Sequence, residues 1–103
     1  MTWKETNSKY NVRGRKEAIS QRLKRSFEMT RFGELDCFVY PTGGYFMLDA
    51  FVKFGAIVVG YADTEEDARL YRFEDGDLFY LEDLDEEEMF QKILEEINRE
   101  MNL

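Results

Sequence analysis

Apolar residues recur at helical spacing near both ends of the chain. In residues 15–29, Ile19, Leu23 and Phe27 follow one another at intervals of four, which places them on one narrow stripe of a helix. A second, wider apolar face lies near the C-terminus and consists of Phe90, Ile93, Leu94, Ile97 and Met101. The pattern therefore predicts an N-terminal and a C-terminal helix.

The start of the second helix has a recognisable signature. Asp85 and, three residues later, Glu88 match a capping box, and the carboxylates of Glu86 and Glu87 favour the positive end of the helix dipole. We therefore expect this helix to begin at about residue 85.

Between the helical runs, apolar residues occur in short stretches typical of strands. Residues 35–40 and 45–54 flank Pro41, Thr42 and two glycines, which predicts a hairpin. Residues 56–62 supply a third strand and residues 78–81 a final one. Thr64 and the acids after it predict a short helix to about residue 72, with a strand over 69–74 as the alternative.

The hairpin register determines which side chains share a face. If Tyr40 lies opposite Tyr45, Asp36 and Asp49 face each other on the less apolar side. The opposite face then forms the core, with Leu35, Cys37, Val39, Phe46, Leu48, Ala50, Val52 and Phe54.

These elements predict an α+β fold in a single domain over residues 1–103. We expect about four strands in a mainly antiparallel sheet, flanked by the N- and C-terminal helices in the order α-β-β-β-(α)-β-α. Hydrophobic residues make up 44% of the chain, which is enough for one core at a length of 103 residues. Residues 1–13 lack periodicity and are expected to be a loosely ordered lead-in.

The sequence favours a cytoplasmic location. No apolar stretch approaches the length that spans a bilayer, and no secretory leader is evident, so we expect no membrane contact. The lone cysteine, Cys37, lies in an apolar run and is expected to be a small buried residue rather than a reactive thiol.

Charge is distributed unevenly along the chain. The net charge is -8, but residues 1–32 carry nine Lys/Arg against three Asp/Glu. Residues 63–88 are strongly acidic, and their candidate partner-binding residues are Asp63, Glu65, Glu66, Asp67, Glu74, Asp75, Asp77, Glu82, Asp83, Asp85, Glu86 and Glu87. A negative field of this kind speeds the capture of cationic surfaces, and it disfavours contact with nucleic acid.

Catalytic and metal-binding motifs are missing from the sequence. The chain has no histidine, which excludes Ser/His/Asp and Cys/His triads and the commonest zinc ligand. The acidic turns do not match a calcium loop, because Leu78, Phe79 and Leu81 occupy ligand positions. We therefore expect no enzyme, cofactor or metal, and only the Asp36 and Asp49 pair merits a test as paired carboxylates.

The leading hypothesis is a small acidic binding protein that acts as an inhibitor or as an immunity or antitoxin-like protein of a bacterium or phage. Its partner would be a basic protein, such as a toxin or a nucleic-acid-binding protein. One alternative is nucleic-acid or regulatory binding through a basic helix over residues 13–25, whose patch is Arg13, Arg15, Lys16, Arg22, Lys24 and Arg25. A second alternative is a domain whose acidic surface has no partner.

Overall fold

A computed structural model of the chain describes residues 9–72 and 75–102. Its helices are α2 (Val12–Leu23), α3 (Glu65–Arg69) and α4 (Glu86–Met101), with a short 3-10 helix, η1 (Val52–Phe54). Its strands are β1 (Glu28–Phe32), β2 (Leu35–Val39), β3 (Tyr45–Phe51), β4 (Ala56–Ala62) and β5 (Asp75–Tyr80).

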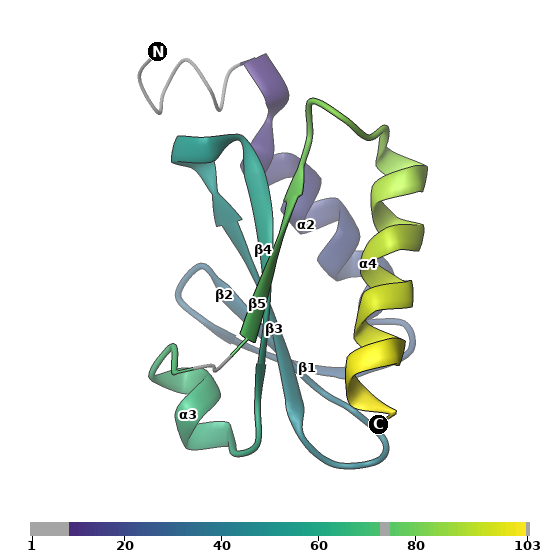
Figure 1. Cartoon of the computed structure of the whole chain (residues 1–103). Coiled ribbons are helices and arrows are strands. Elements are labelled where there is room, and N and C mark those ends of the chain that lie inside the picture. Colours follow the sequence, from purple (N-terminus) through teal and green to yellow (C-terminus); the bar gives the residue numbers. More distant parts are fainter. Residues whose placement is uncertain (1–8, 73–74, 103) are drawn as a thin grey trace.

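The five strands form one antiparallel sheet in the order β1-β2-β3-β4-β5 (Figure 1). The expected α+β class, the antiparallel sheet and the two terminal helices are confirmed, but the described sheet has five strands rather than four. The additional strand is β1, which pairs with β2 through the two-residue turn at Gly33 and Glu34. Gly33 adopts a positive φ of 65°, which such a turn requires and which glycine tolerates.

The N-terminal helix is shorter than the apolar spacing predicted. It begins at Val12, inside the expected lead-in, and ends at Leu23 rather than near residue 29. Phe27 lies beyond the helix and packs its ring against Tyr40, with 5.6 Å between the ring centroids. The i+4 spacing of Phe27 therefore reflected burial in the same core, while pairing with β2 drew the following residues into a strand. Residues 1–8 of the predicted lead-in lie outside the described residues.

The predicted register of the β2–β3 hairpin is wrong by one residue. Tyr45 lies opposite Val39 instead of Tyr40, and Phe38 lies opposite Phe46. Tyr40 instead closes the turn, because its N–H donates to the Gly44 carbonyl at 3.1 Å. A shift of one residue changes which residues of the two strands share a face, so the predicted core face mixed residues from both faces.

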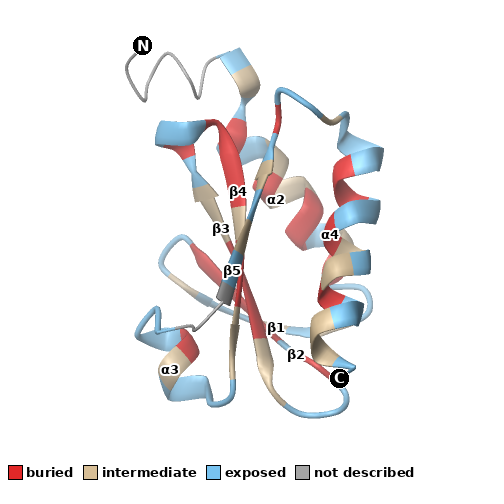
Figure 2. Ribbon diagram, in the orientation of Figure 1, coloured by how far each residue is buried: buried red, intermediate tan, exposed pale blue. Residues whose placement is uncertain are grey.

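The main core lies between the sheet and the two long helices. Figure 1 shows α2 and α4 on the same side of the sheet, and Figure 2 shows buried residues on their inner faces. The rings of Phe38 and Phe46 stack there with centroids 4.9 Å apart. Apolar residues in this cluster that are no more than 1% exposed are Val12, Ile19, Leu23, Phe38, Phe46, Leu48, Ile57, Val59, Met89, Ile93 and Ile97.

The opposite face of the sheet has a smaller covering. Leu35, Cys37 and Met47 form a separate buried cluster with Ala68 of α3. Because α3 is only five residues long, it covers one end of this face and leaves the other end without a helix (Figure 1).

The links between the later elements are short. Strand β3 ends at Phe51, and η1 followed by Gly55 in the left-handed region makes a tight reversal into β4. The predicted short helix after Thr64 is confirmed. Helix α3 begins after Thr64, whose side chain accepts a hydrogen bond from Asp67 N–H. Strand β5 starts at Asp75, three residues earlier than the apolar run indicated.

The C-terminal helix matches its sequence signature. Asp85 caps α4 by accepting a hydrogen bond from Glu88 N–H at 2.8 Å, and Phe90, Ile93 and Ile97 are buried. No helix in the described part of the chain is long and apolar enough to cross a membrane.

Candidate protein-binding surface

The acidic residues of 63–88 form two separate groups instead of one continuous surface. The first group surrounds α3, where Asp63, Glu65 and Glu66 are exposed and Asp67 is half-buried. The second group lies in the connection from β5 to α4 and in the first turn of α4, where Glu82, Asp83, Asp85, Glu86 and Glu87 are exposed. Strand β5, which is about 17 Å long at 3.3 Å per residue, lies between the two groups in the chain.

The two groups differ in how far their charges are compensated. In the second group, Glu87 pairs with Arg22 of α2 at 2.7 Å, and this contact lowers the pKa of Glu87. Hydrogen bonding to the Glu88 N–H lowers the pKa of Asp85, so that cap is ionised at neutral pH. The basic helix therefore neutralises only part of the acidic segment.

Asp77 of β5 faces the helices. The side chain of Asp77 is half-buried on the α4 side, near Glu96. Burial, with a further contribution from Glu96 and Glu100, raises the pKa of Asp77. Asp75 is the first residue of the strand, and Glu74 lies outside the described residues.

Three of the six residues of the predicted basic patch, Arg13, Lys16 and Arg22, form ion pairs within the chain. Arg13 lies 3.6 Å from Glu34, and Arg22 contacts both Glu87 and the ring of Phe90, with 3.7 Å to the ring centroid. Lys24 and Arg25 are exposed, whereas Arg15 is half-buried. The six residues therefore do not form one free cationic surface.

Lys16 was assigned to that patch, and this assignment is wrong because Lys16 is buried. Its Nζ lies 2.7 Å from Asp36 Oδ2 and donates to the Glu34 carbonyl at 2.7 Å. The Arg31 Nε donates to Asp36 at 2.7 Å, and Arg31 also reaches Glu17 on α2. Burial by itself raises the pKa of Asp36, but hydrogen bonds from Arg31 and Lys16 outweigh it and hold the pKa below its ordinary value. This network fastens α2 to the sheet.

Asp36 and Asp49 do not form a carboxylate pair. With the observed register, Asp36 points toward α2 and is fully buried, while Asp49 lies on the opposite face. There Asp49 accepts hydrogen bonds from the Tyr71 hydroxyl at 3.0 Å and from Ala50 N–H at 2.9 Å. The one-residue error in the register created the predicted pair.

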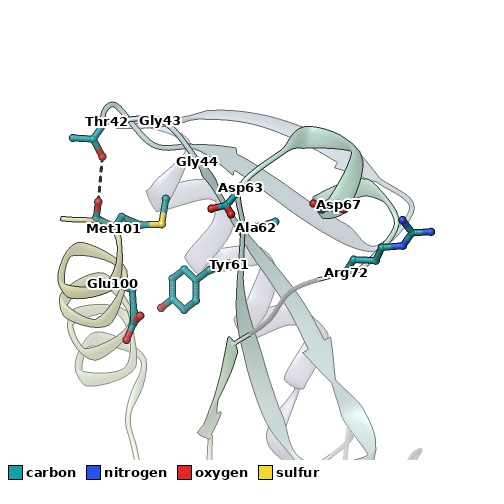
Figure 3. Close-up of a pocket in the computed structure, with 10 residues that line it drawn as sticks. All are labelled: Thr42, Gly43, Gly44, Tyr61, Ala62, Asp63, Asp67, Arg72, Glu100 and Met101. Carbon is teal, nitrogen blue, oxygen red and sulfur yellow. Dashed lines mark hydrogen bonds between the residues drawn. The ribbon is translucent and has the colours of Figure 1, made fainter. Parts of the chain in front are cut away.

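A hollow lies where the β2–β3 turn, the end of β4 and the end of α4 meet, and Figure 3 shows the residues around it. Its volume is about 510 Å³, and the hydroxyl of Tyr61 is buried beside it without a hydrogen-bond partner in the structure. Burial raises the pKa of Tyr61, and Asp77, Glu96 and Glu100 raise it further. Its lining is Thr42, Gly43, Gly44, Tyr61, Ala62, Asp63, Asp67, Arg72, Glu100 and Met101. Among the described residues, no three His, Cys, Asp or Glu side chains are placed to hold a metal ion.

Cys37 is buried, as expected, and lies under α3 in the smaller cluster. Burial raises the pKa of its thiol to about 11, so the thiolate that reacts with electrophiles is scarce at neutral pH.

An exposed apolar surface occupies the part of the sheet that α3 leaves uncovered. Register places Val58 of β4 beside Leu78 of β5, and Ala56 beside Tyr80, so their side chains share this face. Phe51 follows on β3, and its ring stacks on Phe54 with 4.7 Å between centroids. We call this surface the open-face patch and define it as Phe51, Phe54, Val58, Tyr71, Leu78 and Tyr80.

Exposure distinguishes the open-face patch from an ordinary sheet face. Leu78 is 41% exposed, Tyr80 44% and Phe54 53%, although each is apolar or aromatic and adjacent to others of its kind. On β5 the charged Asp77 lies on the helix side of the sheet, while the apolar Leu78 and the aromatic Tyr80 lie on the open face. Exposed apolar residues gathered in this way mark interaction sites.

Tyr71 joins the open-face patch at a conformational cost. It follows α3 with a φ of 59°, in the left-handed region where a helix usually ends in glycine. The N–H of Arg72 bonds to the Asp67 carbonyl and that of Tyr71 to Ala68, which is the Schellman arrangement. Tyrosine is less favourable than glycine in this backbone conformation. It places an aromatic side chain, 43% exposed, beside Asp49.

The sequence pattern did not predict the open-face patch. Residues 78–81 were recognised as strand, but the neighbouring pattern of acidic and apolar residues did not show which side carried the helices. The sequence Asp77-Leu78-Phe79-Tyr80 carries a signal for this surface. Side chains alternate along a strand, so Asp77 lies on one face and Leu78 and Tyr80 on the other. One of the two faces must be exposed, and it carries either Asp77 or the Leu78 and Tyr80 pair.

Comparison of the chain with protein-family models, with curated proteins and with solved structures found no match. The function must therefore be argued from the surface itself.

Proposed function

We propose that this chain is a non-catalytic binding protein that holds a basic protein partner against the open-face patch. The observation that carries the proposal is the uncovered end of the sheet, where Leu78, Tyr80 and Phe54 are exposed on the face opposite the long helices. Aromatic and aliphatic residues clustered in this way supply the desolvated centre of a protein interface.

Acidic residues at both ends of the open-face patch indicate the charge of the partner. The α3 acids lie beyond one end of β5, and Glu82, Asp83 and Glu86 lie beyond the other. Carboxylates at the rim of an interface steer a cationic partner and raise its association rate more than they raise affinity. A patch flanked in this way selects a partner with an apolar centre and basic flanks.

An inhibitor or an immunity or antitoxin-like protein is the form of this function that we favour. Such a protein needs a preformed surface, fast capture of a basic target and no chemistry of its own. A cytoplasmic location is part of the proposal, because Cys37 is buried as a free thiol and makes no disulfide.

The contact can be tested by crosslinking. Two variants carry a photoreactive phenylalanine analogue, one in place of Tyr80 and the other in place of the exposed Gln91 on α4. Cells of the native host that express each variant are irradiated. We expect a basic protein to be crosslinked from position 80 and not from position 91.

The captured protein is then purified and its binding measured. We expect binding that weakens with salt, because the rim acids contribute, and that is weakened about tenfold or more by Leu78→Ser, since removing a central apolar contact costs about 1–2 kcal/mol. Val39→Ser is the matched control, because Val39 is 39% exposed on the same face but lies outside the patch. Crosslinking from position 91 alone, or a captured protein that binds Leu78→Ser as well as wild type, contradicts the proposal.

A further inference from the structure

Strand β5 lies at one edge of the described sheet. In the order β1-β2-β3-β4-β5, strand β5 pairs with β4 on one side only. No described strand pairs with the other side of β5, and Gly76, Leu78 and Tyr80 are exposed on the open face beside it.

The hydrogen-bond phase of β5 shows which backbone groups point outward. The N–H of Leu81 donates to the Gly55 carbonyl at 3.0 Å. Bonded and non-bonded pairs alternate in an antiparallel ladder, so Phe79 and Asp77 bond to β4, and the backbone groups of Leu78 point away from it. The N–H and C=O of Leu78 are therefore available to a further strand.

The two sides of this edge differ in chemistry. On the open face, an added strand would bring alternate side chains beside Leu78 and Tyr80. On the helix face lies a hollow of about 280 Å³ formed by Phe79 and four charged residues of α4, which are Lys92, Glu95, Glu96 and Arg99. Asp77 adds a third carboxylate beside Glu96.

From the open edge, the exposed apolar side chains and the carboxylates on the helix face, we propose that β5 receives an extended segment of the partner as a sixth strand. The segment alternates apolar residues, which pack beside Leu78 and Tyr80, with basic residues, whose stems lie on Phe79. Their charged ends reach Asp77 and Glu95, because Glu96 already pairs with Arg99. Strand addition of this kind obtains affinity from main-chain hydrogen bonds and specificity from alternate side chains. The proposal rests on the proposed function and specifies how the partner binds.

A second copy of this chain does not meet these requirements. Two β5 strands side by side would bring the Asp77 carboxylates of the two copies toward each other, and each chain carries a net charge of -8. An inward-pointing charge on an edge strand opposes pairing with strands that supply no counter-charge. Asp77 therefore makes the edge selective for a cationic strand.

The test uses the full chain and a short capped peptide in which lysine and valine alternate. Amide hydrogen exchange is measured by NMR with and without saturating peptide. We expect exchange at Leu78 N–H to slow by about tenfold or more, because the amide gains a hydrogen bond, while Phe79 N–H, which already bonds to β4, changes little. An unchanged rate at Leu78 would overturn the proposal, since the peptide would then bind without extending the sheet.

A pair of variants isolates the backbone contribution. Leu78→Pro removes the outward N–H, whereas Leu78→Ala keeps this donor although it removes more of the side chain. We expect the proline variant to bind the peptide about tenfold more weakly than the alanine variant. Equal binding by the two variants overturns the proposal, and if Leu78→Pro does not fold, the exchange measurement on the wild-type chain decides.

Control peptides test the alternation. A peptide of the same composition with its lysines and valines in two blocks, and one that alternates glutamate with valine, should both bind at least tenfold more weakly. Equal binding of the block peptide would overturn the proposal in favour of general charge attraction, and a dimer of the free chain that Leu78→Pro abolishes would overturn it in favour of self-pairing. If the peptide fails while crosslinking from position 80 still captures a basic protein, strand addition fails and the proposed function stands.

Discussion

The two faces of the sheet are built from alternate residues of the same strands, and they differ in how far helices cover them. On one face, α2 and α4 cover Ile57, Phe46 and Leu48 completely. On the other, α3 covers one end and leaves Leu78 and Tyr80 exposed. The comparison teaches that stability is concentrated between the sheet and the long helices, so the opposite face is free to carry a binding surface.

The polar residues follow the same division. The helix-covered face contains the fully buried Asp36, satisfied by Lys16 and Arg31, whereas the open face contains Asp49, held by Tyr71 next to exposed aromatic rings. The first arrangement fixes a helix to the sheet. The second positions a strained tyrosine in the open-face patch.

The largest expected effect compares neighbouring residues of β4 that point to opposite faces. Ile57→Ala should lower the free energy of unfolding by about 2–5 kcal/mol, because it leaves a cavity under the helices. Val58→Ala, on the half-buried open face, should cost about 1 kcal/mol. Urea unfolding followed by circular dichroism measures both, and equal losses would break the distinction between the faces.

Removing Lys16 should have the next largest effect. Lys16→Met leaves Asp36 buried with Arg31 as its remaining cationic partner, so we expect a loss of about 3 kcal/mol. Lys24→Met is the matched control, and because Lys24 is exposed its effect should be under about 0.5 kcal/mol.

The same variant has a predicted pH dependence. The pKa of Asp36 is lower in the folded than in the unfolded chain, so its contribution is present above the ordinary carboxyl pKa and is lost as pH falls through the folded value. Without Lys16 the folded pKa rises, and the midpoint of acid unfolding should move to higher pH. An unmoved midpoint would contradict the role assigned to Lys16.

A smaller effect is expected at Tyr71. Tyr71→Phe removes the hydroxyl that donates to Asp49 and should cost about 1 kcal/mol in urea unfolding. Tyr80→Phe provides the control on the same face, since its exposed hydroxyl makes no hydrogen bond within the described residues. Equal stability of the two variants would show that the Asp49 contact does not hold Tyr71 in place.

The smallest effect is a gain in stability. The folded pKa of Asp77 is raised by burial and by Glu96, so the ionised form is disfavoured in the folded chain. Asp77→Asn should therefore stabilise the chain by under about 1 kcal/mol at neutral pH, and the difference should vanish as pH falls below the ordinary carboxyl pKa of about 3.9. Glu82→Gln, at an exposed position, should change the free energy of unfolding by under about 0.5 kcal/mol at neutral pH. A loss of stability in Asp77→Asn at neutral pH would contradict the assignment of Asp77 to a crowded carboxylate group.

The sequence by itself determined the local elements. The Asp85 cap and the apolar spacing of α4, the Thr64 cap of α3, and the strands on either side of Pro41 and the two glycines were all readable, because caps, turns and periodicity depend on residues close together in the chain. The burial of Cys37 also followed from its apolar neighbours.

The tertiary structure decided the features on which function depends. Strand β1 forms because β2 lies beside it, and the hairpin register follows from a turn closed by Tyr40, so neither is encoded in spacing alone. A register shift of one residue moves every side chain to the other face, and therefore the sequence could not show that Asp36 is buried with Lys16 or that Leu78 is exposed. Charge counts along the chain likewise could not reveal that β5 divides the acidic segment, because only packing determines which carboxylates become neighbours.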